Sequence, residues 1–153
     1  MNEFLWPVRV YYEDTDAGGV VYYANYLKFM ERARTEWLRE LGFEQDALRN
    51  EDGIIFAVRA VQIDYLKPAR FNDLLQVSVR TLRAGKASVT LAQSVARDGQ
   101  GDALCTATVK LASLDVQTLR PKAVPAAVEQ AIAATLSAGA RDVLPNAIDS
   151  LGE

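Results

Sequence analysis

The chain has 153 residues, 50% of them hydrophobic, and a formal net charge of -3. A chain of this length buries one hydrophobic core, and its acidic balance gives no diffuse positive field for duplex nucleic acid. Because the sequence contains no histidine, it excludes Ser-His-Asp and Cys-His nucleophilic pairs and metal sites built on histidine ligands. We therefore expect a single domain whose candidate chemistry depends on carboxylates.

The one cysteine, Cys105, cannot form an intramolecular disulfide, so nothing in the sequence indicates an oxidising compartment. It lies in a strand-like segment without an evident base, which favours a buried core thiol over a nucleophile. No apolar run reaches the ~20 residues that span a bilayer, and Met1–Val8 lacks the features of a signal peptide. The sequence thus predicts a cytoplasmic protein without a transmembrane segment.

The N-terminal part of the chain predicts one strand, one loop and one helix. Val8–Tyr12 is short and β-prone, and it runs into an acidic segment that contains Gly18 and Gly19. From Asn25 onward apolar residues recur every three or four positions, and Gly42 marks the end of this pattern. A helix of roughly four turns is expected. Because its apolar stripe is wide, we expect a curved sheet to wrap around it.

The rest of the chain predicts four strands and a terminal helix. The strand-like segments are rich in Val, Leu, Ile and Thr and are Ile54–Tyr65, Leu74–Leu82, Ala87–Ala96 and Ala103–Leu114. The last two separators are short enough for hairpins, so the segments predict an antiparallel sheet and an α+β fold class. We expect residues 1–125 to form the domain, and residues 126–153 to form an alanine-rich helix, Ala126–Ala138, outside the sheet and a loosely held tail.

The sequence EDTDAGGVVYYANY, residues 13–26, places carboxylates and a glycine pair directly before the predicted helix. Unpaired N–H groups at a helix start stabilise a developing oxyanion, and glycines let a substrate carbonyl approach the backbone. A nearby carboxylate can attack that carbonyl or activate water. Turn formation and capping by the aspartates explain the same pattern without catalysis, and the segment lacks the lysine and spacing of a nucleotide phosphate loop.

Longer stretches of the chain resemble a known family. They are Val8–Tyr22, Asn25–Tyr26, Glu31–Glu36, Tyr65–Arg70 and Asp73. This pattern resembles the hotdog-fold acyl-CoA thioesterases of the 4-hydroxybenzoyl-CoA thioesterase family, and more narrowly their Tol–Pal-associated branch. The resemblance implies a long central helix wrapped by a curved antiparallel sheet of about five strands. It also implies homodimers formed by sheet pairing, often assembled into homotetramers, with active sites between subunits.

The resemblance further implies a reaction and its catalytic residues. An acyl-CoA is expected to be hydrolysed to a free acid and CoA, without a metal or a bound cofactor. The family's catalytic carboxylate corresponds to Asp16, and the backbone N–H near Tyr23 corresponds to the donor for the thioester carbonyl. Asp14 is then left as a turn or capping residue. Whether Asp16 acts as nucleophile or as general base stays open at this level.

Tyr23 departs from the Tol–Pal-associated branch, which usually carries histidine at this position. Tyr23 offers only a phenol or its backbone amide for catalysis. This departure motivates an alternative, in which the chain is a non-catalytic acyl-CoA or acyl-carrier-protein binding module, or a scaffold of the cell-envelope or phospholipid-synthesis machinery.

Further residues around the motif are predicted to support the site. Gly19 is a predicted substrate contact through its backbone. Tyr12, four positions before Asp16, either orients that carboxylate by a hydrogen bond or packs as a strand residue at a subunit interface. Glu31 is a second candidate base, but we favour an ion pair with Arg34, because a charge in an enclosed helix needs a partner.

The remaining predicted contacts lie among the strands. The residues of one hairpin turn resemble the place where the family receives the phosphates and pantetheine of CoA, with a solvated loop as an equal alternative; they are Arg83, Lys86 and Ser88. The residues predicted to line the acyl or pantetheine channel, for which core packing is an equal explanation, are Phe56, Ala57 and Val58. An acyl carrier protein is a further candidate partner, and the sequence does not specify the acyl group.

Overall fold

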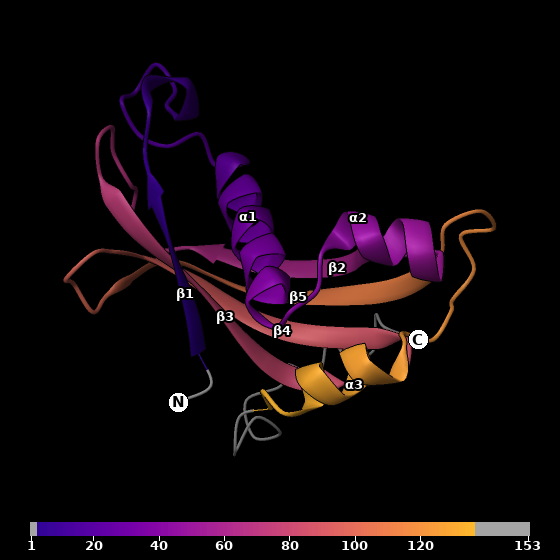
Figure 1. Cartoon of the computed structure of the whole chain (residues 1–153). Coiled ribbons are helices and arrows are strands. Elements are labelled where there is room, and N and C mark those ends of the chain that lie inside the picture. The colour runs from indigo at the N-terminus through magenta and orange to yellow at the C-terminus, as the bar shows by residue number, and fades with distance from the viewer. Residues whose placement is uncertain (1–2, 137–153) are drawn as a thin grey trace.

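The computed structural model describes residues 3–136, which form one antiparallel sheet and a few helices (Figure 1). The strands are β1 (Glu3–Arg9), β2 (Ile54–Tyr65), β3 (Leu74–Ala84), β4 (Ser88–Arg97) and β5 (Ala103–Asp115). The helices are α1 (Asn25–Glu40), α2 (Gln45–Ala47) and α3 (Ala126–Ala133), with a 3-10 turn at Tyr12–Asp14 and a π-helical turn at Leu48–Asp52. The predicted α+β class is confirmed. None of the helices in this part of the chain is long and apolar enough to cross a membrane.

The strands lie in the order β1-β3-β4-β5-β2, and every neighbouring pair is antiparallel. β3, β4 and β5 follow one another through short turns, as the sequence predicts. β2 comes earlier in the chain but pairs with β5, in a register from Ile54↔Asp115 to Tyr65↔Cys105. β1 and β2 are therefore the two edges of the sheet, and β2 has one unpaired side along its 12 residues within the described chain.

The helix α1 forms where apolar residues recur at helical spacing. Its buried residues are Asn25, Tyr26, Phe29, Met30, Ala33, Trp37 and Leu38. This side packs over β1, β3 and β4 (Figure 1). The 16 residues of α1 span about 24 Å. Within one chain the sheet does not wrap around α1, because its outer surface, including Leu27 at 41% exposure, faces solvent.

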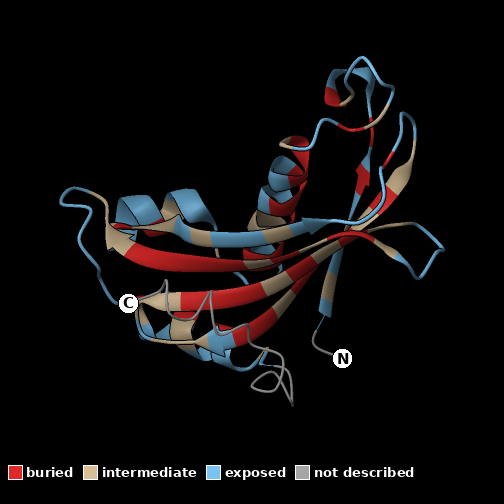
Figure 2. Ribbon diagram, turned by 180° about the vertical axis from the view of Figure 1, so that it is seen from behind, coloured by how far each residue is buried: buried red, intermediate tan, exposed pale blue. Residues whose placement is uncertain are grey.

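One hydrophobic core joins α1, the sheet and α3. Figure 2 shows the buried residues along the strands and on the inner side of α1. Phe29 and Met30 of α1 are fully buried in this core, and Val128 and Ile132 of α3 belong to the same cluster. Truncation of a buried side chain of this size costs about 2–5 kcal/mol of stability. The division of the chain at residue 125 stays a prediction.

The N-terminal strand differs from the prediction. β1 spans Glu3–Arg9 beside β3, whereas the sequence predicts Val8–Tyr12. The strand ends early because Asp14 Oδ2 accepts the backbone N–H of Tyr11 at 2.9 Å and draws the chain into a 3-10 turn. Pro7 lies within β1, where proline is tolerated because β1 is an edge strand. In a sequence, a proline argues against a strand, so the pattern did not predict one over Glu3–Arg9.

The C-terminal helix is shorter than predicted. α3 ends at Ala133, where the prediction continues to Ala138. Thr135 Oγ1 donates to the Ile132 carbonyl and lies 2.6 Å from Thr81 Oγ1, so the chain leaves the helix to run against β3. Residues 137–138 and the predicted tail over residues 141–153 lie outside the described residues.

Candidate active site

The loop that carries Asp16 is a tight turn before α1. The backbone N–H of Asp16 donates to the Val20 carbonyl at 2.9 Å, and the N–H of Gly19 donates to the Asp16 carbonyl at 3.0 Å. Gly19 has a φ of 79°, in the left-handed region where any side chain is strained. The second glycine of the motif therefore closes the turn that presents Asp16.

Hydrogen bonds fasten this loop to the segment before β3. The Val21 N–H donates to the Ala69 carbonyl at 2.8 Å, and the Ala69 N–H donates to Tyr26 Oη at 3.0 Å. Burial raises the pKa of the Tyr26 hydroxyl, so it stays protonated at neutral pH. Because Tyr26 belongs to the first turn of α1, these bonds hold the loop and the helix start in fixed positions.

The two aspartates of the motif have different surroundings. Asp14 is 8% exposed; its Oδ2 accepts the Tyr11 N–H, and its carbonyl accepts Asn25 Nδ2 at 2.9 Å. The predicted turn role of Asp14 is confirmed. Asp16 is exposed, and its Oδ1 accepts the Gly18 N–H at 2.8 Å. Its Oδ2 has no partner in the described chain, so Asp16 keeps an oxygen for a substrate or a water molecule.

The start of α1 presents backbone donors next to this loop. The Asn25 N–H donates to the Tyr22 carbonyl at 2.8 Å, but the N–H groups of Tyr23 and Ala24 have no acceptor within residues 3–136. No side chain in the described part of the protein caps the helix. These N–H groups and the helix dipole favour negative charge at this point. The arrangement suits a carbonyl oxygen on which negative charge develops.

An open cavity of about 250 Å³ lies beside the helix start. Its lining residues are Val21, Tyr23, Tyr26, Tyr65, Leu66, Lys67 and Pro68. The ring of Tyr65 lies 6.0 Å from that of Tyr23 and 5.6 Å from that of Tyr26, measured between centroids. Sequence reasoning assigned no site role to Tyr26 or Tyr65. Both fall in stretches that carry the family resemblance, which is the sequence signal that marks them.

Tyr12 is not placed as predicted. It lies in the 3-10 turn instead of a strand, and its ring stacks on Phe71 with the centroids 3.9 Å apart. No hydrogen bond joins the Tyr12 hydroxyl to Asp16 in the described chain, so the proposed orientation of that carboxylate is wrong for this conformation. Tyr12 is 76% exposed, and a contact between Tyr12 and substrate stays a prediction.

The predicted ion pair between Glu31 and Arg34 is wrong. Glu31 Oε2 accepts the Thr35 hydroxyl at 2.7 Å, and Arg34 Nη1 donates to Gln93 Oε1 at 3.0 Å. Burial lowers the pKa of Arg34, and the nearby charge of Glu31 opposes that shift. The two charges are therefore close enough to interact, but each has a neutral hydrogen-bond partner.

The predicted CoA contacts are far from Asp16 within one chain. The Val10 N–H donates to the Asp73 carbonyl at 2.9 Å, which ties the Asp16 side of the molecule to the start of β3. The predicted hairpin residues lie at or beyond the opposite end of β3, about 30 Å from its start by strand length. They are Arg83, Lys86 and Ser88. One chain therefore does not bring the catalytic and phosphate-binding candidates together.

Two of the three predicted channel residues share a cavity. Phe56 and Val58 line a space of about 150 Å³ between β2 and the second half of α1. Ala57 is partly buried on the opposite side of the strand, because successive side chains alternate between faces. Val58 is 48% exposed, so core packing does not account for it within one chain. A channel lined by Phe56 and Val58 stays a prediction.

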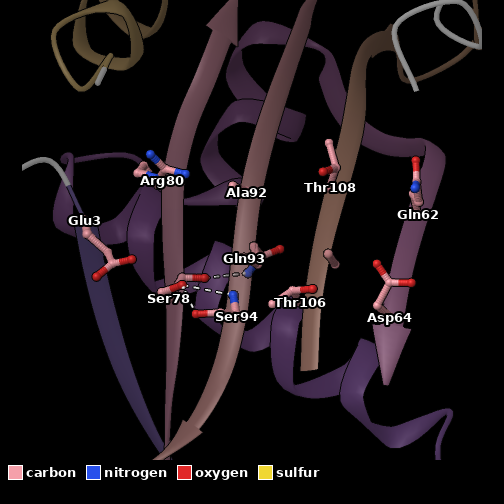
Figure 3. Close-up of a pocket in the computed structure, with 11 residues that line it drawn as sticks. Glu3, Gln62, Asp64, Ser78, Arg80, Ala92, Gln93, Ser94, Thr106 and Thr108 are labelled. Atoms are coloured by element: carbon pink, nitrogen blue, oxygen red, sulfur yellow. Dashed lines mark hydrogen bonds between the residues drawn. The ribbon is translucent and has the colours of Figure 1, made fainter. Parts of the chain in front are cut away.

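A polar cavity of about 280 Å³ lies on the face of the sheet that α1 does not cover (Figure 3). Its charged lining residues are Glu3, Asp64 and Arg80, beside the hydrogen-bonded hydroxyls of Ser78 and Ser94 at 2.8 Å. Sequence reasoning did not find it, because the residues that line the cavity come from all five strands, whose order the sequence does not state. It contains none of the predicted site residues.

An antiparallel sheet in this strand order with one principal helix on one face has the architecture of the hotdog class of thioesterases. The comparisons with known proteins agree with this class. A family profile described as the thioesterase-like superfamily matches residues 10–132. The chain therefore belongs to the thioesterase-like superfamily.

Similar proteins narrow the class further. The acyl-CoA thioesterase YbgC of Haemophilus influenzae is 46% identical over 130 residues, which are 85% of this chain and 94% of that protein. The acyl-CoA thioester hydrolase YbgC of Escherichia coli O6:H1 is 42% identical over 125 residues, covering 82% of this chain and 92% of that protein. A solved probable thioesterase from Bartonella henselae has a TM-score of 0.76 at 34% identity, covering 80% of this chain and 99% of that one. This chain is an enzyme of the thioester hydrolase class.

Proposed function

We propose that this chain hydrolyses the thioester of an acyl-CoA to a free acid and CoA, with Asp16 as the catalytic carboxylate. The observation that carries the proposal is the exposed Asp16 carboxylate, held by a closed turn beside the N–H groups of Tyr23 and Ala24, which have no acceptor among the described residues. The names of the relatives from H. influenzae and E. coli support the substrate class.

In the proposed reaction the thioester carbonyl oxygen accepts hydrogen bonds from the backbone at the start of α1. Asp16 then either attacks the carbonyl carbon or removes a proton from an attacking water. The first route expels the CoA thiolate and leaves a mixed anhydride, which water hydrolyses to the acid and regenerates Asp16. The second route passes through a tetrahedral intermediate that collapses with loss of the thiolate. Both routes use a carboxylate and amides, and call for neither a metal nor a bound cofactor.

The substrate is proposed to bridge two copies of the chain. β2 is an edge strand with exposed apolar side chains, Val58 at 48% and Val61 at 36%, which suits pairing with the same edge of a second copy. Sheet pairing there brings residues of a second chain to the Asp16 side of the first. This arrangement supplies the phosphate contacts that one chain holds about 30 Å away. We propose a homodimer of this kind, with a homotetramer as its further assembly.

Steady-state hydrolysis of an acyl-CoA panel by the wild type and by Asp16→Asn tests the proposal. Loss of the carboxylate is expected to lower kcat by about 100-fold or more, the usual size of a general acid–base contribution. Glu13→Gln is the matched control, because Glu13 is an exposed neighbouring carboxylate and its loss is expected to leave kcat unchanged. Equal rates for the wild type and Asp16→Asn remove Asp16 from the mechanism.

The same panel separates catalysis from binding alone. Tight binding of acyl-CoA with no release of thiol favours the non-catalytic binding module that the missing histidine suggests. A cytoplasmic location, an acyl-carrier-protein partner and membership of the Tol–Pal-associated branch stay predictions of the sequence.

A further inference from the structure

The cavity between α1 and β2 has apolar walls and a polar side. It holds about 150 Å³. The apolar lining residues are Trp37, Leu38, Phe56, Val58 and Leu111, and the polar ones are Glu31, Arg34, Thr35 and Gln45. An apolar cavity with a few convergent polar groups is the usual form of a small-molecule subsite. The polar side chains therefore indicate that the cavity binds a group with hydrogen-bonding atoms.

Arg34 is held rigidly at this cavity. Its Nη1 donates to Gln93 Oε1 at 3.0 Å, and Gln93 Nε2 donates in turn to the carbonyls of Met30 at 3.1 Å and Ser78 at 3.2 Å. Gln93 is 2% exposed and cannot turn away without breaking these bonds. Arg34 has five N–H donors, and in residues 3–136 only this bond uses one of them. A fixed and partly buried guanidinium thus faces the cavity with unused donors.

Glu31 supplies an acceptor on the same side. Its Oε2 accepts the Thr35 hydroxyl at 2.7 Å, and Thr35 Oγ1 accepts Gln45 Nε2 at 3.3 Å. This chain of bonds along the cavity wall orients the carboxylate. Glu31 and Arg34 do not bond each other in the described chain, so a donor and an acceptor both remain available to a third group.

We propose that this cavity binds a hydroxyl group at the far end of the acyl chain, so that the substrate is an ω-hydroxyacyl thioester. A hydroxyl accepts from Arg34 and donates to Glu31, which satisfies both side chains at once. A carboxylate in its place is repelled by Glu31, and a plain methyl group leaves the guanidinium desolvated without a new partner. The inference rests on the proposed function, because it takes the reacting carbonyl to lie at the start of α1.

The geometry of one chain sets the length of that acyl group. Arg34 follows Ala24 by ten residues, which is about 15 Å along the helix axis. An extended carbon chain advances about 1.2 Å per bond, so about twelve bonds cover this distance. Leu27 of α1 and Val61 of β2 are exposed apolar side chains on the two elements that flank this path. The predicted ligand is therefore apolar along its length and polar at its end.

The test measures binding and so does not depend on hydrolysis. The probes are non-hydrolysable CoA thioethers with alkyl chains of about eight to fourteen carbons, each with and without a terminal hydroxyl. Calorimetry with the full chain is expected to show about 10-fold or greater tighter binding of the hydroxylated member at the best length, as for a hydrogen bond to a charged group. Equal affinity for both members at every length, or no binding of either, overturns the inference.

Substitutions in the cavity test whether the tighter binding of the hydroxylated thioether depends on it. Arg34→Met is expected to reduce the preference for the hydroxylated thioether to about 2-fold or less while binding of the plain alkyl thioether is retained. Glu31→Leu, at an exposed position, is expected to act in the same direction and serves if Arg34→Met does not fold. Arg32→Met is the matched control, since Arg32 lies over the Phe29 ring and outside the cavity. A preference that survives both cavity variants contradicts the assignment.

Failure of the hydroxyl site and failure of the proposed catalytic function give different results. If Asp16→Asn hydrolyses acyl-CoA as fast as the wild type, the catalytic proposal fails while the binding preference still stands. If the wild type hydrolyses plain and hydroxylated acyl-CoA with equal kcat/KM and binds their thioethers equally, the hydroxyl site fails while the catalytic proposal still stands.

Discussion

Replacement of Gly19 by alanine tests whether the backbone conformation of the Asp16 turn contributes to stability and to activity. Gly19 has a φ of 79°, and apart from its chain neighbours no atom of the described residues lies within 4 Å of an added Cβ, so the cost comes from the backbone alone. An L-residue in the left-handed region costs about 1–2 kcal/mol. The lower entropy of alanine in the unfolded chain offsets about 0.4–1 kcal/mol of this. The net loss is about 1 kcal/mol, which lowers the Tm of a chain of this length by about 2–4 °C.

Gly99 provides the matched control for this variant. It has a φ of 78° in the turn between β4 and β5, and an added Cβ there also lies more than 4 Å from the described residues other than its chain neighbours. Thermal unfolding is expected to show the same loss of Tm for Gly19→Ala and Gly99→Ala. Only Gly19→Ala is expected to lower kcat/KM, because relaxation of the strained backbone at residue 19 shifts the N–H that donates to the Asp16 carbonyl. An unchanged Tm for Gly19→Ala refutes the backbone argument, and equal kcat/KM for both variants refutes the link to Asp16.

Two further predictions concern buried groups around the site. Tyr26→Phe leaves the buried Ala69 N–H without its acceptor and is expected to lower the free energy of unfolding by about 1–3 kcal/mol, measured by urea titration; unchanged stability contradicts the anchoring of the loop to α1. Burial raises the pKa of the Cys105 thiol to about 12, so the thiol stays protonated and inaccessible at pH 8. Iodoacetamide labelling followed by mass spectrometry is expected to modify it only after unfolding, and rapid labelling of the native protein contradicts its burial.

Local sequence patterns predicted most of the elements. β2 has the bounds expected for Ile54–Tyr65, and α1 begins at Asn25 as its apolar spacing indicates. These elements follow from alternation and helical periodicity, which are local properties. The first strand was misplaced because Asp14 stops it through a side-chain hydrogen bond to Tyr11, and hydrogen bonds of this kind leave little trace in hydrophobic patterning. The position of β2 next to β5 depends on contacts distant in the sequence.

The candidate site was predictable only in part for the same reason. The separate roles of Asp14 and Asp16 follow from the motif and its resemblance to a family, and the structure confirms the turn role of Asp14. The expected pair of Glu31 and Arg34 failed because Gln93, 59 residues further along the chain, takes the guanidinium. A helical spacing of three residues indicates that two charged side chains can meet. It does not indicate which side chain from a distant strand competes for one of them.

A crystal structure of Asp16→Asn with a bound acyl-CoA tests the central claim most directly. The account predicts the thioester carbonyl oxygen about 3 Å from the backbone nitrogen of Tyr23 or Ala24, with the side chain of residue 16 beside the carbonyl carbon. A thioester bound elsewhere, such as in the polar cavity on the opposite face of the sheet, contradicts it.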